Sequence, residues 1–232
     1  MKDKVVISAS IACADFGCLK QTLKELEESG VRLLHFDVVD GHFAPTFIMG
    51  PPVLASLRKY TSLPFEAHLA CYHPERFLSQ FRDAGTDYFT FHFEAVEDPS
   101  HFASLVRKKG MKPVMALRPE TPQEELSDDL LSLLDMILIL TVKPGFAGQK
   151  FDERVLPKIG LLAERLKTVN PKCLIEVDGN INETTIPEVV KQGAKVLVGG
   201  TSGLFRKDRS IEESVKIMRN SALRILERGS CL

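Results

Sequence analysis

The chain has 232 residues, of which 44% are hydrophobic and 26% charged, the balance of a folded globular protein rather than a disordered one. Its 30 Lys and Arg residues are offset by 31 Asp and Glu residues, so a formal net charge of −1 leaves no broad basic face for nucleic acid. No apolar run approaches the ~20 residues of a membrane span. Neither nucleic acid nor a membrane is therefore an expected partner.

Cysteine usage and the N-terminal sequence indicate the compartment. The chain has 5 cysteines, and no two of them form a Cys-x-x-Cys pair. The charged start, Met1 to Lys4, runs into too few apolar residues for a secretory signal peptide. We therefore expect free thiols and a reducing, cytoplasmic compartment.

Short apolar runs alternate along the chain with longer segments of helical spacing. The runs have the length and continuous apolar character of parallel strands that are buried on both faces. They cover residues 5–10, 33–37, 65–69, 88–92, 112–117, 136–140, 174–178 and 196–199. No linker or low-complexity segment divides them, which predicts a single domain over residues 1–232.

The segments between these runs place apolar residues three and four apart, as amphipathic helices do. Val155, Ile159, Leu162 and Leu166 share one such face. Several segments end in a glycine just before the next run, where a left-handed cap costs glycine little. The alternation predicts an α/β protein and a single (β/α)8 TIM barrel. The alternative is an open doubly wound sheet, but no GxGxxG motif follows the first run.

Polar residues stand at the C-terminal ends of the predicted strands, where such barrels carry their active sites. His35 and Asp37 are two positions apart, so they point to the same side of their strand. His68 and Asp178 occupy matching ends of other strands. Two histidines and two carboxylates at one mouth suit a divalent transition metal such as zinc, iron(II) or manganese. A metal-free hydrogen bond between His35 and Asp37 in the core is the alternative.

Other polar residues near these strand ends leave two interpretations open. Glu176 lies two before Asp178 and is interpreted as a structural partner inside the barrel. His92 and Glu94 either adjoin the metal ligands or lie on the surface. Cys13 and Cys71 fall on loops near the predicted mouth, where most positions have no part in a site.

Glycine-rich loops follow the last three predicted strands, at residues 144–149, 178–180 and 199–203. Backbone N–H groups in such loops can hold a phosphate without any Lys or Arg. In these barrels the phosphate site is built from the loops after the last two strands. The loops therefore predict a phosphate site, with tight loop packing as the alternative.

A metal beside two carboxylates and a phosphate site indicates proton chemistry next to the carbonyl of a small sugar phosphate. The metal would stabilise the enediolate that forms when the neighbouring carbon loses its proton. Two carboxylates on opposite faces of that plane could remove a proton from one side and return one to the other. Such a transfer inverts one stereocentre.

Several of these motifs together resemble a known family, the ribulose-phosphate 3-epimerases. Residues 35–45 read HFDVVDGHFAP, residues 67–69 read AHL, residues 144–149 read PGFAGQ and residues 176–179 read EVDG. With Ser10, these motifs extend the resemblance over almost the whole chain. The resemblance implies a (β/α)8 barrel that catalyses reversible 3-epimerisation of a phosphorylated ketose.

The same resemblance implies roles for individual residues. His35, Asp37, His68 and Asp178 would bind one divalent ion per chain, whether zinc, iron(II), manganese or cobalt, and Asp37 and Asp178 would be the acid/base pair. The implied substrate contacts are Ser10, His68, Gly145, Phe146, Ala147, Gly148, Asp178, Gly179, Asn180, Gly200, Thr201 and Ser202. A homo-oligomer is implied as well.

Three strings favour one branch of the family. PETP at 119–122, PGFAGQ at 144–149 and GTSGLF at 200–205 resemble the D-allulose-6-phosphate 3-epimerases, which predicts conversion of D-allulose 6-phosphate to D-fructose 6-phosphate. Epimerisation of D-ribulose 5-phosphate to D-xylulose 5-phosphate is the alternative.

Two further alternatives concern the reaction itself. Val39, Ala70 and Leu140 stand where the family usually has methionines, and this departure is the ground for an inactive phosphosugar-binding barrel. A decarboxylase or aldolase would need a lysine at the reacting centre. Lys143, on a loop, is the one lysine near a predicted strand end.

Overall fold

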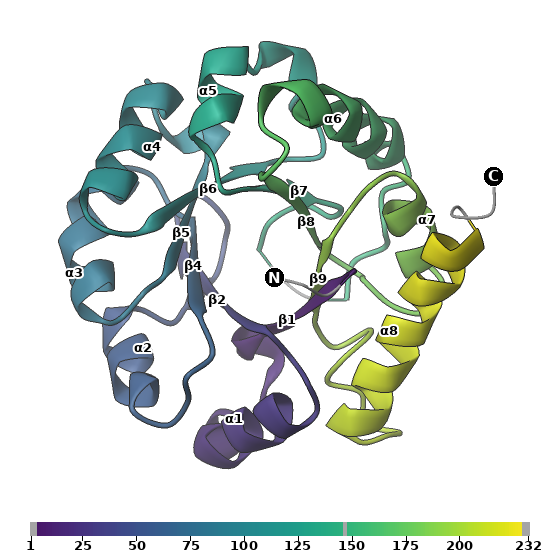
Figure 1. The fold of residues 1–232 in the computed structure, drawn as a ribbon. Coiled ribbons are helices and arrows are strands. Elements are labelled where there is room, and N and C mark those ends of the chain that lie inside the picture. Colours follow the sequence, from purple (N-terminus) through teal and green to yellow (C-terminus); the bar gives the residue numbers. More distant parts are fainter. Residues whose placement is uncertain (1–3, 146–147, 229–232) are drawn as a thin grey trace.

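Each predicted strand forms in the computed structural model, which describes residues 4–145 and 148–228. The strands run in parallel in the order β1-β9-β8-β7-β6-β5-β4-β2, and pairing of β1 with β2 closes them into a barrel. Their bounds are β1 Val6–Ser10, β2 Leu33–Asp40, β4 Phe65–Ala70, β5 Tyr88–His92, β6 Lys112–Leu117, β7 Met136–Leu140, β8 Leu174–Asp178 and β9 Val196–Gly199. Figure 1 shows this barrel along its axis, inside a ring of helices.

One α-helix follows each barrel strand along the chain, as the alternation predicted. These helices are α1 Leu19–Glu28, α2 Pro51–Arg58, α3 Leu78–Asp83, α4 Pro99–Lys108, α5 Asp128–Leu133, α6 Val155–Val169, α7 Ile186–Lys191 and α8 Ile211–Arg228. The four apolar residues that share one face of α6 are all buried. Gly30 and Gly193, which follow α1 and α7, have φ angles of 89° and 111°, the left-handed conformation expected of caps.

One strand pairing was not predicted. Strand β2 continues beyond Asp37 to Asp40 and pairs antiparallel with a short strand, β3 (Phe47–Ile48). The side chain of Asp40 accepts hydrogen bonds from the backbone N–H groups of His42 and Phe43, which holds the turn between the two strands. The strand is therefore longer than its apolar run because a hairpin extends it at the barrel mouth.

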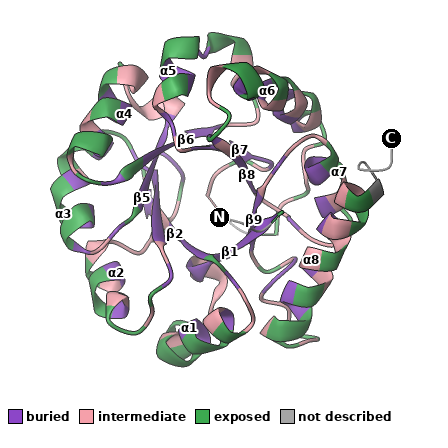
Figure 2. Ribbon diagram, viewed as in Figure 1, coloured by how far each residue is buried: buried purple, intermediate pink, exposed green. Residues whose placement is uncertain are grey.

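Alternation of side chains along the strands gives the barrel two apolar layers. Outward-facing residues such as Ile7, Leu34 and Phe36 belong to the main core beneath the helices. Inward-facing residues at the strand starts, such as Val6 and Leu33, form a separate core inside the barrel. Figure 2 shows the buried strands within helices whose outer faces are exposed. Because the strand starts are closed by this inner core, the opposite end is left for a site.

The described residues thus form one closed (β/α)8 barrel, and the predicted fold is confirmed. No helix within the described part of the chain is long and apolar enough to cross a membrane. Cys13, Cys18, Cys71 and Cys173 are free thiols. The cytoplasmic compartment and a single domain running over residues 1–232 stay predictions.

Candidate active site and metal centre

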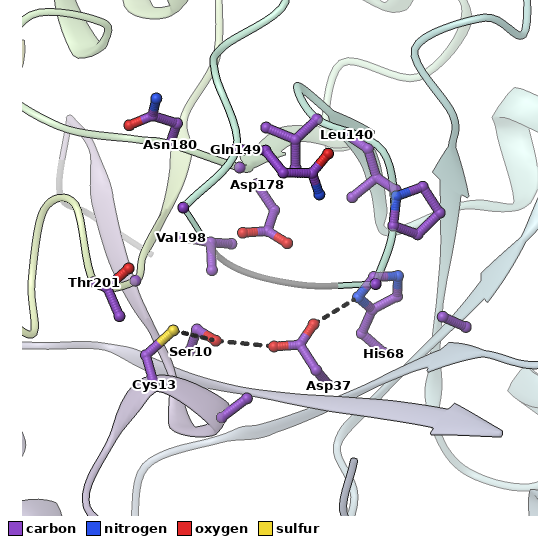
Figure 3. A pocket seen from close by; sticks show the side chains of 18 of the residues that line it. Ser10, Cys13, Asp37, His68, Leu140, Gln149, Asp178, Asn180, Val198 and Thr201 are labelled. Atoms are coloured by element: carbon purple, nitrogen blue, oxygen red, sulfur yellow. Dashed lines mark hydrogen bonds and ion pairs between the residues drawn. The ribbon is translucent and has the colours of Figure 1, made fainter. Parts of the chain in front are cut away.

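A cavity of about 160 Å³ opens at the C-terminal ends of the barrel strands. Figure 3 shows side chains from several strands pointing into it. Most of the predicted site residues line it: Ser10, Asp37, His68, Gly145, Gly148, Asp178, Gly179, Asn180, Gly200, Thr201 and Ser202. Phe146 and Ala147 lie outside the described residues, and His35 is fully buried below the cavity.

Three of the four predicted metal ligands form a tight triangle of donor atoms. His35 Nε2 lies 3.1 Å from His68 Nδ1 and 3.3 Å from Asp37 Oδ1. His68 Nδ1 is 3.2 Å from the same Asp37 oxygen. Donors that bind one ion at ~2.0–2.2 Å lie about 3.0–3.4 Å apart, so the triangle has the size of a coordination sphere. With Asp178 included, donor atoms of all four residues lie within 4.8 Å of one another.

The strand register explains why these residues meet. Asp37 is paired with His68 across β2 and β4, and His35 lies two positions earlier on the inner face of β2. Asp178 ends β8 and reaches the same space from another side of the barrel. Neighbouring strands therefore supply three donors and a more distant strand supplies the fourth.

The electrostatics of the cluster favour a cation. Burial opposes protonation of His35, but the negative charges of Glu66 and Asp37 outweigh it and raise the pKa of His35 well above its ordinary value. A divalent ion would neutralise the same excess of negative charge. It would also lie between His35 Nε2 and His68 Nδ1, the two ring nitrogens that face each other. Two imidazole nitrogens and two carboxylates are ligands that zinc, iron(II) and manganese accept. The residues present therefore fit a metal ion.

The two aspartates differ in acidity although both face the cavity. Burial opposes ionisation of Asp37, but the neighbouring His35 and His68 outweigh it and hold its pKa well below the ordinary value. Burial and the negative charge of Asp37 raise the pKa of Asp178 to about 6. Paired carboxylates with separated pKa values are a common arrangement for acid/base catalysis.

A short chain of hydrogen bonds orients Asp37 from the side opposite His68. The hydroxyl of Ser10 donates to Asp37 Oδ2 at 2.8 Å, and the thiol of Cys13 donates to Ser10 Oγ at 3.7 Å (Figure 3). Cys13 lines the cavity, whereas Cys71 is buried in the main core and takes no part.

Below the predicted metal ligands lies a layer of buried polar residues inside the barrel. His35 Nδ1 is 2.9 Å from Glu66 Oε2, and the hydroxyl of Thr90 donates to Glu66 Oε1 at 2.5 Å. Glu176 Oε1 lies 3.8 Å from His35 Nδ1, and burial together with the charge of Glu66 raises the pKa of Glu176 well above its ordinary value. The interior position expected for Glu176 is thus confirmed.

Glu66 and Thr90 were missed by the sequence reasoning. The signal was present, because Glu66 lies two positions before His68 and therefore on the same inward face of β4. Thr90 lies two positions before His92 on β5 in the same way. Glu66 and Thr90 lie one layer below the strand ends, which were the only positions used to predict the site.

The glycine loops contain residues that pack tightly and residues that line the cavity, while the phosphate site stays a prediction. A Cβ at Gly203 would lie 2.2 Å from the carbonyl oxygen of Ile181, and one at Gly179 would lie 2.6 Å from Val142 Cγ2. These two glycines are required for packing. Gly145 and Gly200 line the cavity, and a Cβ at Gly200 would lie 3.2 Å from Cys13 Sγ.

Comparison with known proteins decides the family. The model of the ribulose-phosphate 3 epimerase family matches residues 6–205. The ribulose-phosphate 3-epimerase of Methanocaldococcus jannaschii is 39% identical over 224 residues, which cover 97% of this chain and 94% of the relative. That of Bacillus subtilis is 37% identical over 206 residues, covering 88% and 94%. The chain belongs to the ribulose-phosphate 3-epimerase family.

Membership of the ribulose-phosphate 3-epimerase family confirms the predicted class of enzyme, an isomerase of the epimerase type. Solved structures support the fold independently. The 3-hexulose-6-phosphate synthase of Salmonella typhimurium gives a TM-score of 0.64 at 18% identity over 95% of this chain and 99% of that one. The phosphoribosyl anthranilate isomerase of Thermus thermophilus gives 0.66 at 14% identity, with the same coverage. At this identity the likeness establishes the barrel alone.

Proposed function

We propose that this ribulose-phosphate 3-epimerase family member interconverts D-allulose 6-phosphate and D-fructose 6-phosphate. D-ribulose 5-phosphate is the alternative substrate. The observation that carries the chemistry is the convergence of the Asp37 and Asp178 carboxylates on one cavity beside His35 and His68. The hexose assignment rests on the PETP, PGFAGQ and GTSGLF strings and on the small side chains of Val39 and Ala70 beside Asp37 and His68.

His35, Asp37, His68 and Asp178 would together hold one divalent ion, whether zinc, iron(II), manganese or cobalt. When bound, the ion would polarise the ketone of the substrate and stabilise the enediolate that follows loss of the proton. The buried Glu66 carboxylate would accept a hydrogen bond from Nδ1–H of His35, which leaves Nε2 of that ring without a proton and facing the other metal donors.

Asp37 and Asp178 would carry the proton transfer. One carboxylate takes the proton from C3 on one face of the substrate, and the other returns a proton on the opposite face. The low pKa of Asp37 keeps that group ionised, whereas a pKa of about 6 lets Asp178 gain or lose a proton near neutrality. Exchange of these roles makes the reaction reversible.

Incubation with each substrate in heavy water tests the reaction directly. We expect deuterium at C3 together with epimerisation. Loss of carbon or chain cleavage would instead indicate a decarboxylase or aldolase, and binding without exchange would indicate an inactive phosphosugar-binding barrel. The homo-oligomer stays a prediction.

Phosphate binding is expected to depend on backbone groups of the loops after β8 and β9. Gly200→Val should raise KM strongly, because its added carbons would enter the cavity next to Cys13. A disturbance of ~1–3 kcal/mol corresponds to roughly 10–200-fold. Lys143→Gln should change KM only modestly, although Lys143 also lines the cavity. Steady-state kinetics of both variants checks the order, and the reverse order would place the phosphate elsewhere.

Substrate length is expected to depend on Val39, Ala70 and Leu140, which all line the cavity. Val39 pairs with Ala70 across β2 and β4, immediately beyond Asp37 and His68, so both small side chains lie next to the metal ligands. Their small volume leaves room for the additional CHOH group of a hexose phosphate.

We expect kcat/KM to favour D-allulose 6-phosphate over D-ribulose 5-phosphate by ~10–200-fold, the usual effect of one small group on pocket fit. The double variant Val39→Met with Ala70→Met should shift this ratio toward the pentose because it refills the cavity. Leu162→Met, on the buried face of α6, is the matched control and should leave the ratio unchanged. An unchanged ratio in the double variant would show that these positions do not set substrate length.

A further inference from the structure

A buried histidine and a half-buried glutamate extend behind the predicted metal ligand His68, away from the cavity. His92 ends β5 and is fully buried, and its Nε2 lies 2.9 Å from Nε2 of His68. On the other side of the same ring, His92 Nδ1 lies 3.3 Å from Glu94 Oε2. His92 therefore adjoins the predicted ligand His68, and the half-buried Glu94 adjoins His92.

Glu94 has a hydrogen-bond partner on each of its carboxylate oxygens. Its Oε1 accepts the backbone N–H of Arg118 at 2.9 Å and the hydroxyl of Thr121. Burial opposes ionisation of Glu94, but hydrogen bonds from His92 and Thr121 outweigh it and lower its pKa to about 2. The carboxylate is thus an acceptor on both oxygens, and the position of the Glu94 side chain is fixed by the loop after β6.

The acceptor role of Glu94 determines the direction of two hydrogen bonds, the one between Glu94 and His92 and the one between His92 and His68. An acceptor at Glu94 requires the proton of His92 on Nδ1, so Nε2 of His92 is bare. A bare Nε2 of His92 accepts a hydrogen bond from Nε2–H of His68. Nδ1 of His68 is then bare as well, and that nitrogen faces His35 Nε2 and Asp37 Oδ1.

We propose that His92 and Glu94 are positioning residues that fix the tautomer of His68, so that its Nδ1 is held bare for a divalent metal ion. The inference rests on the proposed function, because it assigns groups that prepare the same metal site. It adds two residues that touch neither metal nor substrate and act through His68. Outer groups of this kind typically change metal affinity by ~10–100-fold when they are removed.

Glu94→Gln is the sharpest variant because it keeps the shape and reverses the hydrogen bonding. The Arg118 N–H can only donate, so the amide oxygen of the new side chain should stay there and its NH2 group should turn toward His92. His92 Nδ1 must then accept, and its proton moves to Nε2. Two N–H groups would face each other between His92 and His68, which favours a proton on the metal-binding nitrogen of His68.

The test measures the zinc dissociation constant by competition with a chelating dye and the histidine tautomers by 15N NMR of the zinc-loaded protein. We expect Glu94→Gln to weaken zinc binding by ~10–100-fold and to move the His92 proton from Nδ1 to Nε2. Glu94→Asp should keep the wild-type tautomer, because aspartate also only accepts. Glu75→Gln is the matched control, since Glu75 forms a similar 3.3 Å contact with His73 in an exposed position.

An unchanged zinc dissociation constant in Glu94→Gln, or an unchanged His92 tautomer, would overturn the inference. Loss of the wild-type tautomer in Glu94→Asp would also overturn it, because the effect would then come from packing rather than from hydrogen-bond direction. The wild-type titration distinguishes these results from failure of the metal site itself. A wild-type protein that binds no zinc would overturn the proposed site, and the positioning inference with it.

Discussion

Asp178→Asn is expected to lower turnover by at least ~10²–10⁴-fold, the usual contribution of one general acid or base. The substitution keeps the shape of the side chain but removes a group that can accept and release the C3 proton. Asp37→Asn should have an effect of the same size, because the proposed mechanism needs one carboxylate on each face of the substrate. The loss can exceed this range, since each carboxylate is also a proposed metal ligand.

The measurement is kcat for both variants, together with the metal content of each. Metal content separates a lost proton acceptor from a lost ion. Asp135→Asn serves as the control, because Asp135 precedes β7 at the opposite end of the barrel and pairs with Arg107. Near wild-type turnover in either variant with metal bound would show that the mechanism with two carboxylates is wrong.

Removal of the metal is expected to abolish activity. Purified protein should contain about one divalent ion per chain, and a chelator should remove the ion and the activity together. His35→Ala and His68→Ala should lower the occupancy, because each removes a corner of the donor triangle. His101→Ala, on the exposed side of α4, should leave it unchanged.

The bound ion should also stabilise the fold. A ligand present at 100 times its dissociation constant contributes about 2.7 kcal/mol to the free energy of unfolding. For a chain of this size that corresponds to a rise in Tm of roughly 5–10 °C. Calorimetry with and without chelator measures the difference. Full activity in protein shown by elemental analysis to be metal-free would contradict the metal assignment.

The fold was predictable from the sequence because its signal is repeated. Eight apolar runs separated by helical spacing leave few architectures other than a closed barrel. The short strand β3 was not predictable in this way, since a strand of two residues has no periodicity and depends on the turn held by Asp40.

The candidate site was predictable where residues occupy strand ends. Alternation along β2 placed His35 and Asp37 on one face, and the common polarity of parallel strands brought His68 and Asp178 to the same mouth. The buried layer of Glu66 and Thr90 was missed although each lies two positions before a histidine on the same strand, because both residues stand within otherwise apolar runs. Sequence alone could not decide the position of Cys13, since a loop has no period that fixes where its side chains point.

The four proposed metal donors come from different parts of the barrel wall, so metal binding and proton transfer would respond differently to a deformation of the barrel. His35, Asp37 and His68 come from the adjacent strands β2 and β4, whereas Asp178 comes from β8 on another part of the barrel wall. A breathing motion that widens the gap between β2 and β8 would leave the three-donor triangle intact. The same motion would move the two carboxylates apart and stop proton transfer. In the proposed mechanism, three of the four metal ligands would therefore depend on one pair of adjacent strands, whereas proton transfer would also depend on the barrel wall between β2 and β8.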